Sequence, residues 1–325
     1  MHKTNQLTGY PHERFMKNCL TWIGNEFHVT YLLLRSNASL SISQFYVLLL
    51  ARLLAFPSDM TATPRLLVDL SVSAMAYGYT FDIINQTMSV DEDRINKPYR
   101  PIPAGLLSLK QAKVRLFLSV CLSPLIIGAL AGPWAAFWII CWIAWVTFCY
   151  VWPKANNWFF RNAFSALGHI FLLRLMNEIV YSHFSIVNTR FDQDVVNAAL
   201  AMVTVHVQEF HDVEGDRKSG RRTLPLLLSE KGVVVLRQVT ATIFIISSGI
   251  ILIWGFNVCP AGGLLDVHFL GLLFAAASLL TAVRVTLGTP ETKAWDENTY
   301  KFCYVSIFLF LDAYLVQLNR AICQG

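Results

Sequence analysis

The sequence has few charged residues for its length. Only 14% of its 325 residues are Asp, Glu, Lys or Arg, whereas 55% are hydrophobic and the mean hydropathy is +0.48. A water-soluble domain carries about a quarter charged residues. So much apolar surface cannot be hidden in one soluble core. The composition therefore argues against an ordinary soluble protein and favours a chain that lies in a bilayer.

Cysteine patterns and a signal peptide are missing as well. The seven cysteines form no CxxC pair and no metal-binding spacing, and most lie in apolar runs. There cysteine acts as a small hydrophobic residue, so no chemistry is assigned to it. The first twenty residues lack the uninterrupted apolar segment of a cleavable signal peptide. We therefore expect membrane insertion to use an internal span.

Long apolar runs are what the sequence does have. Each of nine stretches is long enough to cross a hydrocarbon layer of about 30 Å as a helix. Backbone groups in lipid must be satisfied within their own segment, so these stretches are expected to be helical. The sequence thus predicts an all-α membrane protein with nine transmembrane helices. Its predicted spans are residues 40–57, 67–88, 114–132, 134–152, 159–182, 194–211, 233–256, 267–285 and 301–319.

The basic residues predict the orientation of these spans. With a cytoplasmic N-terminus, 21 of the 26 Lys and Arg residues fall in the cytoplasmic segments or near the cytoplasmic ends of the spans. This is the distribution that the positive-inside rule expects. The formal charge of +5 is thereby explained without a nucleic-acid partner. Residues 1–36 are predicted to form a cytoplasmic arm with an amphipathic helix at the interface, and residues 37–325 a single transmembrane domain.

An acidic motif ends the second span. Its residues Asn85, Ser89 and Asp93 are spaced by four, so a continuing helix would place them along one face. A similar motif ends the sixth span, where Asp212 and Asp216 are again four residues apart. Carboxylates so close together repel each other, and this costs more near a membrane. A cation is therefore expected beside them.

Basic residues and a proline follow each acidic motif. The first loop reads DEDRINKPYRPIP and the second DVEGDRKSGRRTLP, which suggests a faint internal repeat. Oxygen donors on helices suit Mg²⁺, which commonly binds one or two carboxylates together with substrate phosphates. The nearby bases would neutralise the remaining phosphate charge. Either motif alone could be an ordinary solvated loop, but the pair predicts one shared site for magnesium and a diphosphate.

Nine spans, an Asn-led acidic motif after span 2 and DxxxD after span 6 resemble the UbiA superfamily of intramembrane prenyltransferases. Tyr150, Pro153 and Lys154 are similar to that family's Tyr-Pro-basic segment. The resemblance covers the chain from about residue 30. It implies a helical barrel around a central cavity, in which two Mg²⁺ ions hold an isoprenyl diphosphate. The stretch NQ…S…EDRINKPYRPIPAG also resembles the fungal branch that includes the membrane-bound bergamotene cyclase of fumagillin biosynthesis, which implies the endoplasmic reticulum as location.

The first motif departs from the transferase pattern Asn-Asp-x-x-Asp-x-x-x-Asp. Gln86 replaces the first Asp and Ser89 the second, whereas Asn85 and Asp93 remain. The spacing of Asn85, Ser89 and Asp93 resembles the magnesium-binding triad of soluble class I terpene cyclases, an analogy across unrelated folds. The residues expected to bind Mg²⁺ are then Asn85, Ser89, Asp93, Asp212 and Asp216. Those expected to bind the diphosphate are Lys97, Arg100, Lys154, Arg217 and Arg222.

The leading hypothesis is an intramembrane sesquiterpene cyclase that ionises farnesyl diphosphate. An allylic cation needs a water-poor aromatic cavity, because aromatic faces stabilise cations and water quenches them. The main alternative is a prenyltransferase that joins the same cation to an aromatic acceptor. A third possibility, a lipid-binding or transporter-like protein, explains the paired acidic and basic loops less well.

Several polar residues lie inside the predicted spans. Arg174 and Glu178, four residues apart in span 5, form either a functional or a structural pair. Asp312 faces a cavity or bonds to a neighbouring helix, and the sequence does not decide which. Arg52 needs a partner that the sequence does not identify. His169 and His183 lack metal-ligand spacing and are expected to be packed or interfacial.

Overall fold

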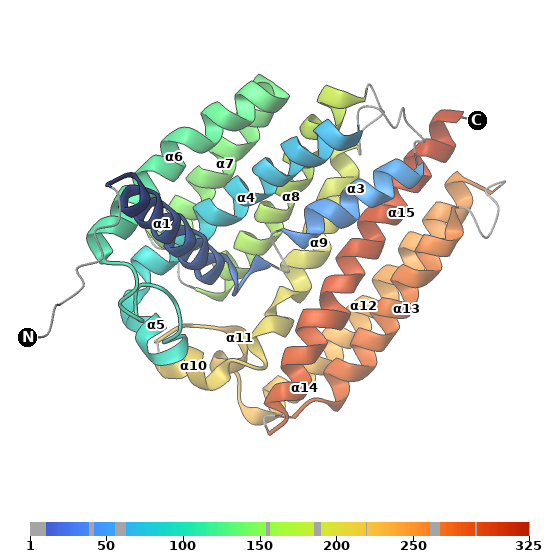
Figure 1. Cartoon of the computed structure of the whole chain (residues 1–325). Coiled ribbons are helices and arrows are strands. Elements are labelled where there is room, and N and C mark those ends of the chain that lie inside the picture. Colours follow the sequence, from blue (N-terminus) through green and yellow to red (C-terminus); the bar gives the residue numbers. More distant parts are fainter. Residues whose placement is uncertain are drawn as a thin grey trace, which may run out of the picture.

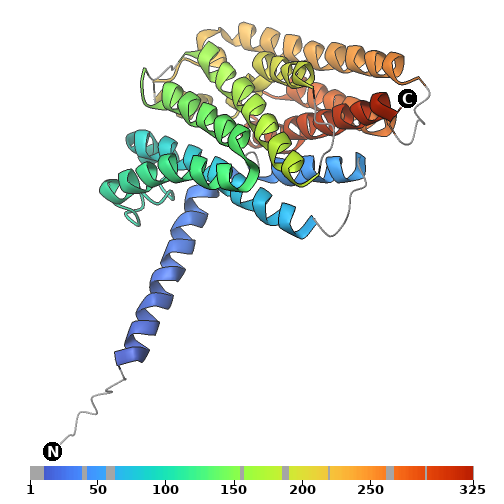
Figure 2. The ribbon, with the colours of Figure 1, turned by 90° about the horizontal axis from the view of Figure 1, so that it is seen from above.

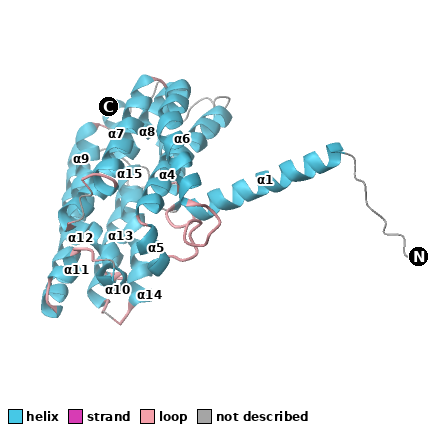
Figure 3. Ribbon diagram, turned by 90° about the vertical axis from the view of Figure 1, so that its left-hand side faces the viewer, coloured by secondary structure: helices cyan, strands magenta, loops and turns pink. Residues whose placement is uncertain are grey.

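The computed structural model describes residues 11–38, 42–55, 63–153, 157–184, 190–218, 220–260, 267–289 and 291–324, and its regular elements are helices (Figure 3). The long helices of the bundle are α3 (Ser43–Ala55), α4 (Thr63–Met88), α6 (Leu109–Ala131), α7 (Pro133–Tyr150), α8 (Trp158–His183), α9 (Phe191–Thr204), α12 (Glu230–Val258), α13 (His268–Leu287) and α15 (Val305–Gln324). The shorter ones are α5 (Val90–Asn96), η1 (Val205–Glu209), α10 (Val213–Lys218), α11 (Leu224–Leu227), α14 (Lys293–Asn298) and η2 (Thr299–Tyr304).

Each predicted span overlaps a helix of the bundle, but the described helices do not confirm a count of nine membrane crossings. Six stretches are long and apolar enough to cross a membrane, namely α6, α7, α8, α12, α13 and Lys293–Ala321. Of the other three, α3 and α9 have only 13 and 14 residues. The third, α4, has 26 residues and includes Arg65, Asp69 and Asp82. The all-α membrane fold is confirmed, and the exact number of crossings stays a prediction.

Neighbouring helices follow the chain around the bundle. α4 packs on α6, α6 on α7, α7 on α8 and α8 on α9. α12 packs on α13, which packs on α15, and α15 then lies along α3 at the start of the chain. The two series of helices meet where α9 contacts α12 and α15 and where α3 contacts α8. The short helices α5, α10, α11 and α14 gather at one of its ends (Figure 1).

Helix boundaries follow local sequence signals. Ser108 caps α6 with a capping box, since its Oγ accepts from Gln111 N and the Gln111 side chain accepts from Ser108 N. Asn157 caps α8 by accepting from Phe160 N. Between α6 and α7, Gly132 has a φ of +91°, a conformation that favours glycine, and Pro133 begins the next helix. This break falls between the predicted spans 114–132 and 134–152.

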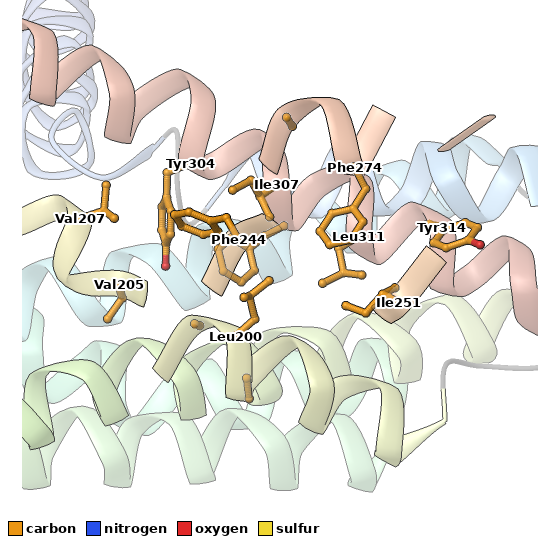
Figure 4. Close-up of a cluster of buried hydrophobic side chains, with 14 of the residues drawn as sticks. Leu200, Val205, Val207, Phe244, Ile251, Phe274, Tyr304, Ile307, Leu311 and Tyr314 are labelled. Atoms are coloured by element: carbon orange, nitrogen blue, oxygen red, sulfur yellow. The ribbon is translucent and has the colours of Figure 1, made fainter. Parts of the chain in front are cut away.

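The hydrophobic core has two main clusters. One lies among α3, α4, α7 and α8, and the other among α9, α12, α13 and α15. In the second cluster Phe244, Phe274 and Tyr314 fill the space between helices (Figure 4). Tyr314 lies against glycines of two helices, and a Cβ at Gly255 would come within 2.0 Å of its hydroxyl oxygen. Small residues thus allow α12 and α13 to approach α15 closely.

The helix α1 (Pro11–Leu34) lies outside the bundle and projects from it at a steep angle (Figure 2). It is held at its C-terminal end, where Gln86 Nε2 donates to Leu33 O at 2.8 Å and Glu26 forms an ion pair with Arg115 of α6. Large apolar side chains such as Trp22 and Phe27 are exposed on it. This arrangement suits a helix at a membrane surface, and the division of the chain at residues 36 and 37 stays a prediction.

Two open hollows lie near the start of α6. One of about 480 Å³ is lined by Leu109, Lys110, Lys113, Val114 and Phe117. A second, of about 300 Å³, lies beside it and includes Glu26 and Arg115. Both lie on the outside of the bundle, beside α1. The central cavity that the resemblance implies therefore stays a prediction.

A buried ion pair fixes the end of the bundle where the short helices gather. Arg237 of α12 donates to both carboxylate oxygens of Asp296 on α14, at 2.9 and 2.6 Å, and to Val285 O at 3.1 Å. Both side chains are buried. Removing one partner of such a pair leaves an uncompensated charge, which costs more than replacing both.

Asp296→Ala is expected to destabilise the protein by about 3–5 kcal/mol, because the Arg237 guanidinium stays buried without its partner. The double variant Arg237→Met, Asp296→Leu should lose less. Thermal unfolding in detergent micelles measures both. Glu297→Ala, which removes an exposed pair with Lys301, is the control and should cost less than about 1 kcal/mol. Equal losses in Asp296→Ala and the control would contradict the prediction.

Candidate functional site

The first acidic motif lies where α4 passes into α5. The helix is interrupted at Ser89, but the spacing of one turn continues through the break. Ser89 N donates to Asn85 O and Asp93 N to Ser89 O, both at 2.9 Å. The three residues therefore follow each other along one side, and Ser89 Oγ lies 3.4 Å from Asn85 Oδ1. Gln86 points elsewhere, since it is fully buried and bonded to Leu33 O.

The second motif follows α9 through the one-turn helix η1. The backbone NH of Asp216 donates to Asp212 O at 2.8 Å, so these two residues are also one helical turn apart, at the start of α10. Asp216 is buried and Asp212 is half-buried. The carboxylate of Asp212 forms no hydrogen bond or ion pair with another residue that the structure describes.

One arginine joins the two motifs. Arg221 Nη1 donates to Asp216 Oδ1 at 2.9 Å, and its Nη2 donates to Glu92 Oε1 of α5. Burial alone would lower the pKa of Arg221, but the Glu92 and Asp216 carboxylates outweigh it and raise that pKa. The guanidinium is therefore a fixed positive charge between the two acidic segments. Motifs remote in sequence meet at the same end of the bundle (Figure 1).

A second arginine holds Asp93. Arg100 Nη1 lies 2.8 Å from each Asp93 carboxylate oxygen, and Arg100 Nε donates to Ser36 Oγ at 3.3 Å. Both side chains are almost inaccessible, with exposed fractions of 1% for Arg100 and 2% for Asp93. Burial raises the pKa of Asp93, while the Arg100 charge opposes that rise. In this arrangement Arg100 positions Asp93, and a direct contact between Arg100 and a diphosphate stays a prediction.

Lys97 is a third cation at this site. It is half-buried at the end of α5, and burial lowers the pKa of its ammonium group, followed by the like charge of Arg100. The carboxylates of Asp93 and Asp212 act on it in the opposite direction, so Lys97 lies within electrostatic range of both. Its side chain makes no ion pair with another described residue. Lys97 is thus available to an incoming anion.

The other predicted phosphate ligands lie at the edge of this site. The side chains of Arg217 and Arg222 are exposed. Arg222 pairs in a backbone bridge with Asn157, which brings the loop before α8 to the second motif. Lys154 lies outside the described residues. Contacts of Arg217, Arg222 and Lys154 with a diphosphate stay predictions.

The side chains at this site fit a magnesium-bound anion by the chemistry of their donors. All the predicted ligands supply oxygen, the donor that Mg²⁺ prefers. Among the described residues, no three Asp, Glu, His or Cys side chains are grouped closely enough to hold a metal by themselves. Asp93 and Asp216 are paired with arginines instead. The site is nearly balanced in charge without ligand, which favours the joint entry of cations and a diphosphate.

Aromatic rings lie directly behind the first motif. Phe81, one turn before Asn85 on α4, has its ring centroid 5.7 Å from Tyr150 and 5.4 Å from Phe164. Tyr150 and Phe164 are 5.1 Å apart, and Trp142 lies 5.9 Å from Phe81. Such a cluster can stabilise a carbocation formed beside Asn85.

The sequence did not reveal every residue of this site. Glu92 and Arg221 were visible as charges, but spacing alone could not show that they form the link between the motifs. The pair of Arg161 Nε and Glu209 Oε1, 2.9 Å apart, was not predicted. The only sign of this pair in the sequence was the acidic residue Glu209, which lies at the end of a predicted span, directly before the second motif.

Comparison with known proteins identifies the family. Residues 45–305 match the UbiA prenyltransferase family. The chain belongs to this family. It is 30% identical to the polyprenyl transferase eriF of Hericium erinaceus over 73% of this chain and 78% of that one. It is 29% identical to the diterpene cyclase eriG of the same fungus, over 75% of each chain. This UbiA family member thus resembles both transferases and cyclases.

A bacterial synthase and a solved structure extend the comparison. The somaliensene A/B synthase of Streptomyces somaliensis is 27% identical over 91% of this chain and 95% of its own. The UbiA homolog of Archaeoglobus fulgidus bound to GPP and Mg²⁺ covers 89% of this chain and 99% of its own, with a TM-score of 0.58 and 15% identity. That likeness supports the fold. The family and the apolar helices show an integral membrane enzyme of prenyltransferase or cyclase type.

Proposed function

We propose that this UbiA family member is a magnesium-dependent terpene cyclase that ionises farnesyl diphosphate and closes the resulting cation to a cyclic sesquiterpene. The observation that carries the proposal is the first motif. Gln86, at the position of the first transferase Asp, is turned away to Leu33 O, whereas Asn85, Ser89 and Asp93 stay in line. That leaves the oxygen pattern of a cyclase rather than a row of carboxylates.

Each group of residues at the site has its own proposed role. Asn85, Ser89, Asp93, Asp212 and Asp216 would hold Mg²⁺, which supplies positive charge to the departing diphosphate. Lys97, Arg217, Arg222 and Lys154 would neutralise the remaining charge of that group. Arg100 and Arg221 keep the acidic side chains in place. The rings of Phe81, Tyr150 and Phe164 would face the allylic cation and exclude water from it.

A transferase is the second candidate, since the match to a polyprenyl transferase is as good as the match to a diterpene cyclase. The deciding experiment uses purified protein, farnesyl diphosphate and Mg²⁺ without acceptor, and measures diphosphate and hydrocarbon together. We expect cyclic hydrocarbon, its loss with a chelator and its return with added Mg²⁺. Turnover only with an aromatic acceptor would favour the transferase, and no release in either case would favour a non-enzymatic protein.

The same assay tests the choice of substrate. Isoprenyl diphosphates with chains of ten, fifteen and twenty carbons are compared at equal concentration. The fifteen-carbon substrate is expected to give the highest kcat/KM. A preference for another chain length would agree with a cyclase function but would reject farnesyl diphosphate as the substrate.

We also propose that the N-terminus and both motifs face the cytoplasm, in the membrane of the endoplasmic reticulum. The support is the bias of Lys and Arg toward that side. In this orientation α1 lies at the cytoplasmic surface, as a unit distinct from the transmembrane domain of residues 37–325. Proteolysis of sealed microsomes should remove an N-terminal tag, and protection of that tag would reject the orientation.

A further inference from the structure

A row of aromatic side chains leads from the second motif into the bundle. Tyr300, Tyr304 and Phe308 are spaced by four along η2 and α15, and successive ring centroids are 5.7 and 5.1 Å apart. At its start Tyr300 stacks on His211, which directly precedes Asp212, with the ring centroids 5.8 Å apart. The row therefore starts beside the proposed diphosphate site.

The aromatic row ends at a buried imidazole and carboxylate. The ring of His169 on α8 lies 5.6 Å from that of Phe308, and its Nε2 lies 3.3 Å from Asp312 Oδ2. Asp312 is the next residue in the same spacing of four. Exposed fractions are 8% for His169 and 2% for Asp312. Asn197 donates to the other carboxylate oxygen of Asp312 and fixes the carboxylate.

This dyad of His169 and Asp312 lies deep in the membrane part of the bundle. Twelve residues separate Tyr300 from Asp312, which is roughly 18 Å at the rise of an α-helix. Eleven residues separate His169 from the start of α8, which gives a similar depth of roughly 17 Å. In the described chain α8 packs chiefly on α7 and α9, whereas α15 packs on α13 and α3. The dyad thus connects two helices that are not close neighbours, across the interior of the bundle.

Two other polar contacts lie on the helices beside the dyad. Arg52 of α3 donates to Asn177 of α8, which supplies the partner that the sequence left open. Arg174 pairs with Asp194 of α9, where the sequence had suggested Glu178. These pairs hold the helices together. His169 Nε2 and Asp312 Oδ2 face each other at 3.3 Å, and neither atom has a further hydrogen-bond partner among the described residues. Buried polar atoms of this kind need a physical explanation, and a catalytic role is one.

We propose that His169, positioned by Asp312, is the base that ends the reaction by taking a proton from the last carbocation. The inference rests on the proposed cyclase function. A C–H bond next to the cationic carbon breaks, its electron pair forms the new carbon–carbon double bond, and the proton goes to the lone pair of the neutral imidazole. The imidazolium then faces the Asp312 carboxylate, which stabilises it. The substrate class is an isoprenoid cation that has travelled along Tyr300, Tyr304 and Phe308.

His169→Gln tests the inference, because it removes the base and leaves the diphosphate site intact. Diphosphate release and the product mixture are measured together, with farnesyl diphosphate and Mg²⁺. We expect release within a few-fold of the wild type, and at least about a tenfold fall in the share of the wild-type alkene. Alcohols from capture by water, or isomeric alkenes, should replace it. Asp312→Asn preserves volume and should shift the products in the same direction, so it serves as the test if His169→Gln does not fold.

The control is Gln193→Met. It removes buried hydrogen bonds between α9 and Asn319 of α15, in the same part of the bundle but away from the aromatic row. Its products should match the wild type, since a merely structural change leaves the base in place. If the folded His169→Gln variant gives the wild-type product mixture, the inference is overturned and the proposed cyclase function is unaffected. No hydrocarbon from the wild type itself would overturn the proposed function, and the base with it.

Discussion

Asp212→Ala is expected to lower the rate of diphosphate release by at least about a hundredfold. Three aspartates are predicted to bind the metal, and two of them, Asp93 and Asp216, form ion pairs with arginines. The carboxylate of the third, Asp212, makes no ion pair within the described chain. It also lies within electrostatic range of Lys97, the cation left for the anion. Removing it should take away the donor that is most accessible to Mg²⁺.

The measurement is diphosphate release at a series of Mg²⁺ concentrations. A weakened metal site should shift the half-saturating Mg²⁺ concentration upward as well as lower the rate. Ser89→Ala is the companion variant and should also lose most turnover, since Ser89 Oγ lies beside Asn85 Oδ1 in the first motif. An Asp212→Ala protein with wild-type release would remove this residue from the proposed metal shell.

Glu214→Ala is the matched control for Asp212→Ala. Glu214 lies two residues after Asp212, in α10, but it is exposed and pairs with Lys218. Its loss changes the charge of the loop by the same amount without touching the site. Its release rate and Mg²⁺ dependence should stay within about twofold of the wild type, because exposed pairs contribute little.

The helices could be predicted from the sequence because each apolar run is long enough to demand satisfied backbone groups. The number of membrane crossings could not be predicted in this way, because α3 and α9 are short and α4 carries charged residues. Hydropathy measures the side chains of one segment, whereas the length of a helix also depends on its packing. The end of the sixth span shows this, because α9 stops at Thr204 and a tighter helical turn continues to Glu209.

The meeting of the two motifs was predictable, and the pairing of their charges was not. Spacing by four showed which residues share a side, and the counts of basic residues placed both loops on one side. Whether an arginine reaches a phosphate or a carboxylate depends on distances between segments remote in sequence. Arg100 was predicted to bind the anion, yet it lies buried against Asp93. Arg221 stands next to Arg222 in the sequence, but Arg221 bridges the motifs and the side chain of Arg222 is exposed.

The bridge formed by Arg221 supports the second prediction with a large effect. Arg221→Gln should lower kcat/KM by about ten- to a hundredfold, because Glu92 and Asp216 then repel each other and the two motif loops lose their link. The loss should exceed that of Arg94→Gln, in which an exposed pair with Asp91 on the same α5 helix is removed. Steady-state kinetics of both variants, at saturating Mg²⁺, measure the difference.

A double-mutant cycle of Arg221→Gln and Glu92→Gln separates two effects of Arg221, namely its bridge between the motif loops and its positive charge. If Arg221 acts by holding the loops together, Glu92→Gln should reduce activity too, and the double variant should lose less than the product of the two single losses. Arg221→Lys keeps the charge but cannot contact both carboxylates in the same planar geometry, so only partial recovery is expected. Full activity in Arg221→Lys, with strictly multiplicative losses in the cycle, would show that only the positive charge matters. The two acidic motifs would then be held together by packing rather than by this guanidinium.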